Sequence, residues 1–205
     1  IDGVDFVGGA PLIYVGAGAV DPLVVPMNCT FQGSRSSGGA SMNDFYAEGP
    51  GRFYPYRCRA ARAYRDGFNY TGNANGSPKF FENECSTGTS GTTSVTDNAS
   101  TSHNDSAGVR LNGRYRGSFG RTVADINDAR VINLGCLFGQ AQSTATSNEC
   151  LTTANTALSW NGGCSFEAGA NPQCCIINTS TLYYRKMAAP VRAGTPEDTG
   201  TLTTW

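Results

Sequence analysis

The chain has 205 residues and nearly balanced charge, with 15 Lys and Arg against 16 Asp and Glu and a single His. This length favours one domain with one sizeable core. The near-neutral charge argues against a nucleic-acid-binding protein, which normally carries a basic excess. No stretch is long and apolar enough for a transmembrane helix. We therefore expect no nucleic-acid partner and no membrane span.

The N-terminal segment, residues 1–27, is apolar, and its stretch Phe6–Val20 contains no charged residue. Its glycines and Pro11 disfavour a helix. Three interpretations remain open: a buried strand of the chain's own core, a strand donated to a neighbouring subunit by β-augmentation, and a membrane-active segment. Pro22 and Pro26 favour donation because they form a stiff spacer before the body. The subunit contacts expected for a donated strand are Phe6, Leu12, Ile13, Tyr14 and Val15.

A globular body is expected over residues 28–187. Within it, Asp44–Tyr70 interleaves eight aromatic residues with five arginines. Such a cluster is typical of a core edge where arginines lie over rings and meet carboxylates. The alternative is a surface that stacks on bases or sugar rings. Residues 58–65 are expected to form a short helix ended by Gly67.

The stretch Ser86–Ser106 is more than half Ser and Thr, so we expect it to bury little and to form a surface loop or exposed strands. Val109–Arg116 is predicted to be a hairpin that turns at Asn112–Gly113. Thr122–Leu134 is the best helix candidate, with Thr122 as its cap. A second, weaker helix is expected between Asn148 and Leu158.

Asn171–Met187 is rich in β-branched and aromatic residues and is predicted to be a strand. Residues 188–205 are polar and are expected to form a C-terminal tail. The predicted fold is therefore mainly β and β-sandwich-like, with one or two short helices.

The eight cysteines are even in number and include no Cys-x-x-Cys pair, so zinc binding is not expected. Four disulfides and an oxidising compartment are predicted. Adjacent strand residues point to opposite faces, so Cys174 and Cys175 should bond to different partners. The predicted disulfide residues are Cys29, Cys58, Cys85, Cys136, Cys150, Cys164, Cys174 and Cys175. Because the chain begins at Ile1 without a signal peptide, we expect a processed, secreted form.

Covalent glycans are expected because several asparagines are followed two residues later by Ser or Thr. Two of them, Asn98 and Asn104, lie in the most polar stretch and are the leading candidates. The predicted acceptors are Asn28, Asn69, Asn75, Asn98, Asn104 and Asn178.

Catalytic arrangements are scarce in the sequence. His103 is the only histidine, and it lies in the Ser/Thr-rich tract, where nothing would orient a general base. Two carboxylates could hydrolyse glycosides without histidine. Glu82 and Glu84 would share one strand face, and Asp125 and Asp128 would share one helix face. No calcium-binding loop or phosphate-binding glycine motif is complete. We predict no catalytic residue, no cofactor and no metal site, and we do not expect an enzyme.

The predicted function is that of an extracellular structural or adhesive surface protein. In its strongest form, the chain is a filament or coat subunit whose partners are copies of itself, joined by the N-terminal segment. The alternative is a secreted carbohydrate-active protein: a lectin, or a glycoside hydrolase with two carboxylates.

Overall fold

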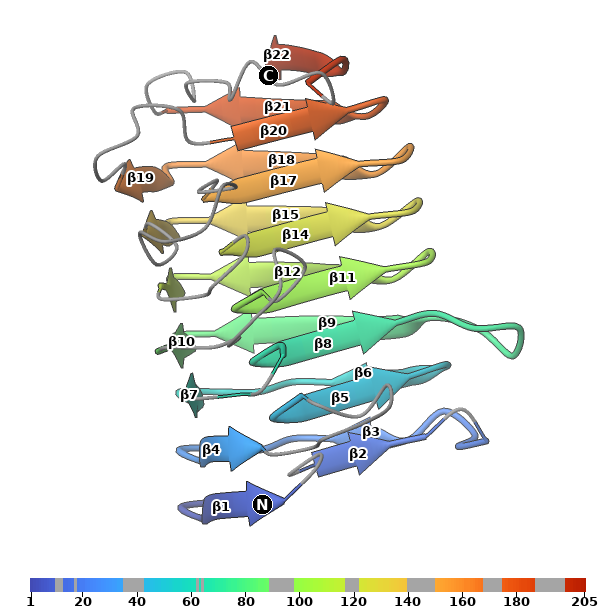
Figure 1. The fold of residues 1–205 in the computed structure, drawn as a ribbon, viewed down its shortest axis with the longest axis vertical. Helices are drawn as coiled ribbons and strands as arrows, with labels where there is room; N and C mark the ends of the chain where they lie inside the picture. The colour runs from blue at the N-terminus through green and yellow to red at the C-terminus, as the bar shows by residue number, and fades with distance from the viewer. Residues whose placement is uncertain are drawn as a thin grey trace.

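The chain folds as a parallel β-solenoid with three sheets (Figure 1). The computed structural model describes residues 1–9, 13–16, 18–34, 43–61, 63, 65–88, 98–116, 122–139, 150–167, 175–186 and 198–205. Within these residues every regular element is a strand, and no helix is long and apolar enough to cross a membrane. The two ends of the chain lie at opposite ends of the long axis (Figure 1).

Each turn of the solenoid adds one strand to each sheet, and every pairing between strands is parallel. Sheet 1 contains β1 (Asp5–Gly9), β4 (Thr30–Ser34), β7 (Arg59–Ala61), β10 (Ser86–Thr87), β13 (Arg114–Tyr115), β16 (Leu137–Gly139) and β19 (Ser165–Glu167). Sheet 2 contains β2 (Ile13–Val15), β5 (Phe45–Glu48), β8 (Phe68–Thr71), β11 (Ser100–His103), β14 (Val123–Ile126), β17 (Leu151–Ala154) and β20 (Cys175–Asn178). Sheet 3 contains β3 (Leu23–Val24), β6 (Gly51–Phe53), β9 (Pro78–Asn83), β12 (Ala107–Leu111), β15 (Arg130–Leu134), β18 (Leu158–Gly162), β21 (Thr181–Arg185) and β22 (Thr201–Thr204).

The corner between sheets 2 and 3 is closed by short turns in which asparagine recurs. Asn104, Asn127 and Asn155 all have positive φ, a conformation that asparagine tolerates better than most residues. The Asn127 amide donates to Asn104 Oδ1 at 3.0 Å, and the Asn155 amide donates to Asn127 Oδ1 at 2.8 Å. The three side chains therefore form a hydrogen-bonded ladder along the solenoid.

The corner between sheets 3 and 1 is turned by a single residue with positive φ, and a buried cysteine usually follows it. Arg57–Cys58, Glu84–Cys85 and Gly135–Cys136 are examples. Asn112 also turns this corner, but Gly113 follows it. A Cβ on Gly113 would lie 2.4 Å from Cε2 of Tyr115, so the Tyr115 ring fills the space where the other turns place a cysteine side chain.

The core has two hydrophobic clusters, one in the N-terminal turns and one in the C-terminal turns. In the first cluster, Phe45, Phe53 and Phe68 are fully buried and pack edge-on or tilted against one another. Together with Tyr70, these residues confirm that part of the aromatic cluster of 44–70 belongs to a core, whereas Tyr54 is exposed. Arg57 lies over the Tyr56 ring at 4.9 Å and pairs with Glu84 at 2.8 Å, as expected for an arginine at a core edge.

A polar network occupies the interior of the middle turns. Arg110 is fully buried, and its guanidinium lies 2.9 Å from Asp125 and 3.8 Å from Glu82. The Glu82 carboxylate accepts the hydroxyls of Tyr115 at 2.6 Å and Ser100 at 3.0 Å. Burial raises the pKa of the Glu82 carboxyl, and the nearby Arg110 charge opposes that rise. Each charge therefore depends on the others to remain inside the core.

The predicted β-sandwich is wrong. A sandwich requires two antiparallel sheets packed face to face, whereas these strands pair in parallel with the equivalent strand of the next turn. The predicted hairpin at 109–116 is wrong for the same reason. Its two strands, β12 and β13, belong to different sheets, and Asn112 turns the corner between them.

The predicted helices are also wrong wherever the structure describes them. Thr122–Leu134 forms β14 and β15, joined through Asn127 and Asp128, both of which have positive φ. The first candidate, 58–65, contains β7, and the last, 148–158, contains β17, although residues 62, 64, 148 and 149 lie outside the described residues. The expected strand at 171–187 is two strands, β20 and β21, in different sheets.

The predicted disulfide framework is wrong, because no disulfide joins two described cysteines. Instead, thiols interact with backbone carbonyls at the corner. Cys58 Sγ lies 3.3 Å from Pro26 O, Cys136 Sγ lies 3.2 Å from Arg110 O, and Cys164 Sγ lies 3.3 Å from Asn133 O. A small apolar side chain with a weak donor suits this buried position. Cys174 lies outside the described residues.

The Ser/Thr-rich tract is not the exposed segment that its composition predicted. Ser100, Thr101 and Ser102 of β11 are fully buried. The Ser102 hydroxyl donates to Asp125 at 2.6 Å, and the Ser100 hydroxyl donates to Glu82. Short hydroxyl side chains can enter a core when they find such partners. Residues 89–97 of the tract lie outside the described residues.

We predict that the thiols of Cys29, Cys58, Cys85, Cys136 and Cys164 are unreactive in the folded protein and reactive after unfolding, because they are buried but not bonded to one another. Ellman's reagent in buffer and in concentrated guanidinium, without reductant, measures this. Finding fewer than five reactive thiols in guanidinium would contradict the structure.

We predict that Arg110→Met destabilises the fold by about 3–5 kcal/mol, because it leaves the buried Glu82 and Asp125 without their cation. Urea unfolding measures this change. Arg114→Ala is the control: Arg114 is exposed, so a change within about 0.5 kcal/mol is expected. Equal effects of the two substitutions would show that the network contributes no special stability.

Candidate functional site

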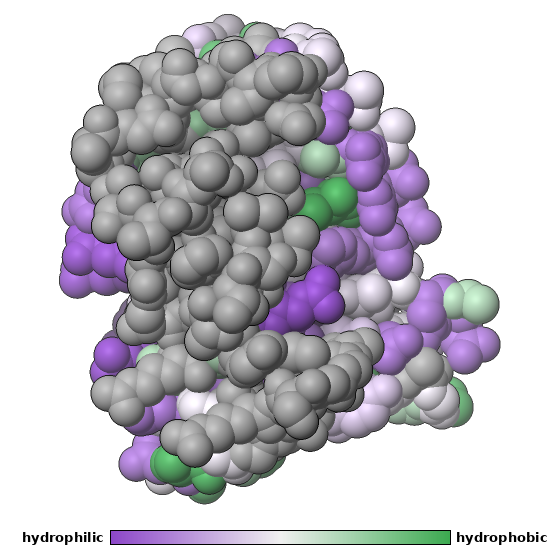
Figure 2. All heavy atoms as spheres, in the orientation of Figure 1, coloured by the Kyte–Doolittle hydropathy of each residue, from purple (hydrophilic) through white to green (hydrophobic). Residues whose placement is uncertain are grey.

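The N-terminal end of the solenoid, formed by residues 1–27, is the strongest candidate site. Among the described residues, ten large hydrophobic side chains are classed as exposed, and seven belong to this end. Figure 2 shows hydrophobic atoms at the lower end of the molecule, where Figure 1 places the N-terminal strands. Clusters of this kind often mark an interaction surface. The seven are Ile1, Val4, Val7, Tyr14, Val20, Leu23 and Met27.

The strands at this end alternate between core and solvent. Phe6 stacks on Phe31 of the next turn, with ring centroids 5.4 Å apart, whereas its neighbour Val7 is 72% exposed. In β2, Ile13 and Val15 pack against the core, and Tyr14 between them is 52% exposed. Leu12 lies outside the described residues. The first turn therefore pairs with β4–β6 of its own chain and also presents apolar side chains outward.

The backbone at this end is open as well. β1, β2 and β3 are edge strands, each paired on only one side with a described strand. Edge strands present N–H and C=O groups that can pair with another chain. An open edge beside exposed apolar side chains is suited to receiving a further layer of strands.

Acidic groups surround this end. Asp2, Asp5 and Asp21 are all exposed. Asp2 accepts the Asn28 amide at 2.9 Å, and Asp21 lies 3.5 Å from Arg52. Tyr14 donates its hydroxyl to Glu48 at 3.2 Å and stacks on Tyr46. Burial and the charge of Glu48 raise the pKa of Tyr46 to about 12.

The C-terminal end, which we define as residues 185, 186 and 198–205, differs in both closure and charge. Asp198 accepts the backbone N–H of Ile177 at 3.1 Å, so the chain covers part of the last turn itself. Above β21, β22 extends sheet 3 and pairs with no further described strand. Arg185 and Lys186 are exposed here, and Arg185 lies over the Trp205 ring at 5.5 Å. This end therefore presents two exposed cations beside the half-buried Asp198, whereas the N-terminal end presents three exposed aspartates.

The acid pairs that a glycoside hydrolase would require are not brought together. Glu82 is inside the core, whereas Glu84 lies at an exposed corner paired with Arg57. Asp125 is fully buried, and Asp128 is exposed at the adjacent corner. Among the described residues no group of three His, Cys, Asp or Glu side chains is placed to hold a metal ion.

The predicted glycan acceptors fall into two groups. The Asn98 and Asn69 side chains are buried and donate to the two oxygens of Asp66, at 3.2 and 2.7 Å. The expectation that Asn98 is exposed is therefore wrong. Asn28, Asn75 and Asn104 are exposed, and Asn178 is half-buried. Glycosylation of these four remains a prediction.

His103 lies on the outer side of β11, with Nε2 2.7 Å from the Thr101 hydroxyl. Burial lowers the pKa of its imidazole to about 4, and the charge of Arg65 acts in the same direction. His103 is therefore neutral at neutral pH, although the charge of Asp125 partly opposes the lowering of its pKa.

No protein-family model matches the chain, and neither a curated protein nor a solved structure matches it.

We predict that His103 titrates with a pKa of about 4 in the folded protein, as measured by NMR. The unfolded chain, with a pKa of about 6.5, binds more protons between these values, so stability should fall as pH decreases from 6.5 to 4. His103→Gln should weaken that dependence. A titration near 6.5 in the folded state would contradict the burial of the ring.

Proposed function

We propose that the protein is an extracellular structural or adhesive surface protein that assembles end to end, with the N-terminal end of one copy resting on the C-terminal end of the next. The observation that carries this proposal is the concentration of exposed apolar side chains beside three open strand edges at residues 1–27. Stacking would pair those edges and place those side chains beside the outward side chains of the next copy.

Stacking would gain from apolar contact and from backbone pairing. Full burial of a Val, Leu or Met side chain is worth about 1.5–3 kcal/mol, and Val7, Val20 and Leu23 are each more than half exposed. New backbone hydrogen bonds along the edges add to this. Association itself costs several kcal/mol in lost translational and rotational freedom, which several such side chains together offset.

Charge favours a head-to-tail arrangement. Asp2 and Asp5 on one end would face Arg185 and Lys186 on the other, whereas two N-terminal ends would bring like charges together. A head-to-tail contact propagates when its rotation does not close a ring. The expected product is a linear filament or coat element.

The proposed contact differs from strand donation. Because β1–β3 already complete the chain's own first turn, stacking adds a layer to an existing sheet and withdraws no strand from the body. The thiols found in place of disulfides remove one argument for an oxidising compartment. The proposed extracellular location therefore rests on the Ser/Thr-rich composition and the exposed glycan acceptors.

We predict that the double variant Val7→Lys/Val20→Lys abolishes self-association or weakens it at least about tenfold, because it places two charges where stacking requires dry apolar contact. Sedimentation velocity over a concentration series measures the assembly. Ile132→Lys is the matched control: it makes the same change at an exposed apolar residue of β15, away from both ends. A monomeric wild-type chain, or equal loss in the control, would refute the proposal.

A further inference from the structure

We propose that the outer face of sheet 3 binds an extended acidic polysaccharide, a ligand that carries carboxylate or sulfate groups along a chain of sugar rings. This binding site is separate from the end-to-end contact. It runs along the side of the solenoid and does not depend on assembly.

An apolar column runs along the middle of this face. The register aligns one outward residue from each of five successive strands, from β9 to β21. The inward neighbours of these residues, such as Val131, Ser159 and Leu182, are buried. A solvated sheet face normally carries polar residues at such positions, so an apolar column there indicates a contact surface. The apolar column is Phe81, Val109, Ile132, Trp160 and Tyr183.

The rings of Trp160 and Tyr183 stack with their centroids 5.4 Å apart and their planes 6° apart. The stack runs along the solenoid axis, so it presents ring edges outward and the column forms a ridge. The C–H-rich faces of sugar rings can lie against such an apolar ridge. Strands follow one another about every 4.8 Å, close to the length of one sugar unit in an extended chain.

A row of cations lies beside the ridge. Arg52, Lys79 and Arg130 point outward from β6, β9 and β15, and the register places them in one line with Ala107 between Lys79 and Arg130. Neither Lys79 nor Arg130 has an ion-pair partner among the described residues. Asp21 lies 3.5 Å from Arg52, and the exposed Asp105 and Asp128 lie at the corner that precedes β12 and β15. The outward row itself is therefore cationic, in a chain whose formal net charge is −1.

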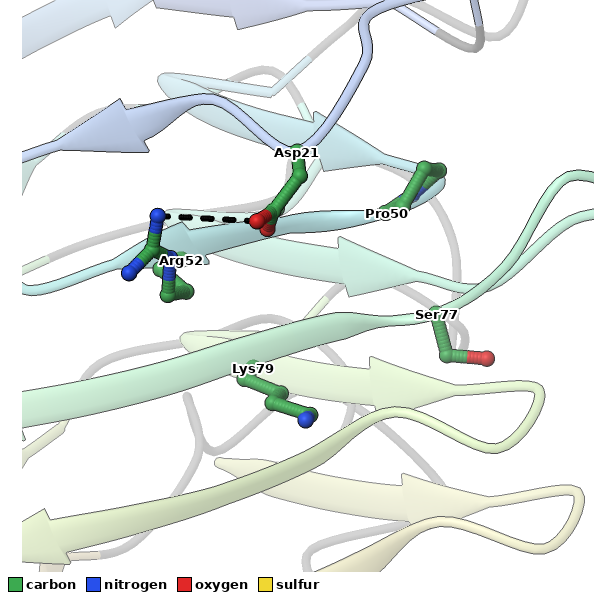
Figure 3. A pocket seen from close by; sticks show the side chains of 6 residues that line it. Asp21, Pro50, Arg52, Ser77 and Lys79 are labelled. Carbon is green, nitrogen blue, oxygen red and sulfur yellow. Dashed lines mark ion pairs between the residues drawn. The ribbon is translucent and has the colours of Figure 1, made fainter.

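Two depressions lie near opposite ends of the same face. One, of about 370 Å³, is lined by Arg52, Lys79 and Ser77, and Figure 3 shows Arg52 and Lys79 on adjacent strands with Asp21 beside Arg52. The other, of about 310 Å³, is lined by Arg185, Lys186 and Trp205 around Gly162. Cations at both depressions and an apolar ridge between them fit a long ligand with repeated negative charge. A small anion would occupy only one depression.

The test is a binding titration with galacturonate oligomers, run at a protein concentration at which sedimentation velocity finds monomers, so that assembly does not contribute. The same oligomers with methyl-esterified carboxylates form the matched neutral ligand. Dextran sulfate with dextran provides the sulfate arm, and poly(dT) tests nucleic acid. At least one acidic glycan should bind about tenfold or more tightly than its neutral partner, with an affinity that falls as salt rises.

The variant Lys79→Ala/Arg130→Ala should lower this affinity about tenfold and reduce its salt dependence. Ile132→Asp, which places a negative charge on the ridge, should abolish binding. Arg59→Ala/Arg114→Ala removes two exposed cations from sheet 1 and should change affinity less than twofold. Circular dichroism of each variant confirms that it is folded.

Three outcomes would overturn the proposal. The first is no acidic glycan bound at about 1 mM. The second is equal loss of affinity in the sheet 1 control. The third is tighter binding of poly(dT) than of either acidic glycan, which would assign the face to nucleic acid. None of them bears on end-to-end assembly, which sedimentation tests independently.

Discussion

The hydrogen-bonded register between successive turns is the constraint on which the rest of this structure depends. Each strand residue lies beside its equivalent in the next turn, as Phe45 does beside Phe68 and Val123 beside Leu151. A side chain that suits one turn must therefore suit its two neighbours. Ladders of like residues follow, such as Asn104, Asn127 and Asn155 at one corner. The same rule leaves an unpaired edge at each end of a sheet, which makes the ends of a solenoid places for assembly.

In the middle turns, two departures from the repeating pattern depend on each other. A glycine replaces the corner cysteine, and charged residues occupy the core. At the corner where other turns carry a cysteine, Gly113 leaves room for the Tyr115 ring, and the Tyr115 hydroxyl then reaches Glu82. Glu82 in turn helps to hold Arg110 in the core. We infer that the network helps to fix the register of the strands. If β12 slipped by one residue, Arg110 would point outward, and Glu82 and Asp125 would remain in the core without their cation.

The sequence predicted the β-rich character and the buried aromatic residues but not the solenoid. A signal for it was present: Cys29, Cys58 and Cys85 are separated by 29 and 27 residues, and Cys136 and Cys164 by 28. In several turns an aromatic residue follows two positions later, as in Cys136-Leu-Phe138 and Cys164-Ser-Phe166. Even spacing of this kind indicates a repeat architecture, but an even number of cysteines also predicts a disulfide framework. The disulfide prediction failed because a cysteine can recur in successive turns for another reason: its small side chain fits the buried corner position.

The helix prediction failed for a geometric reason. In Thr122–Leu134, Val123, Ile126 and Leu134 have a spacing that resembles one helical face. In the structure, Asn127 and Asp128 turn a corner within that span. The apparent face therefore mixes the inward Val123 with the outward Leu134. In strands of three to five residues, the alternation of apolar and polar residues is too short to be recognised, because a corner interrupts it every few residues.

In the N-terminal segment, the alternation of side-chain direction along the strands determines which apolar residues enter the core, which composition alone does not reveal. Composition alone left open whether its apolar residues fill the chain's own core or contact a neighbour. In a strand, successive side chains point to opposite faces, so a segment that is apolar at every position supplies both surfaces at once. Phe6 and Ile13 complete the core, while Val7 and Tyr14 point outward. If the segment served only to complete the core, polar side chains at the outward positions would complete the core equally well and would be better solvated. A role in the core therefore does not explain the apolar side chains at those outward positions. Contact with another molecule does explain them.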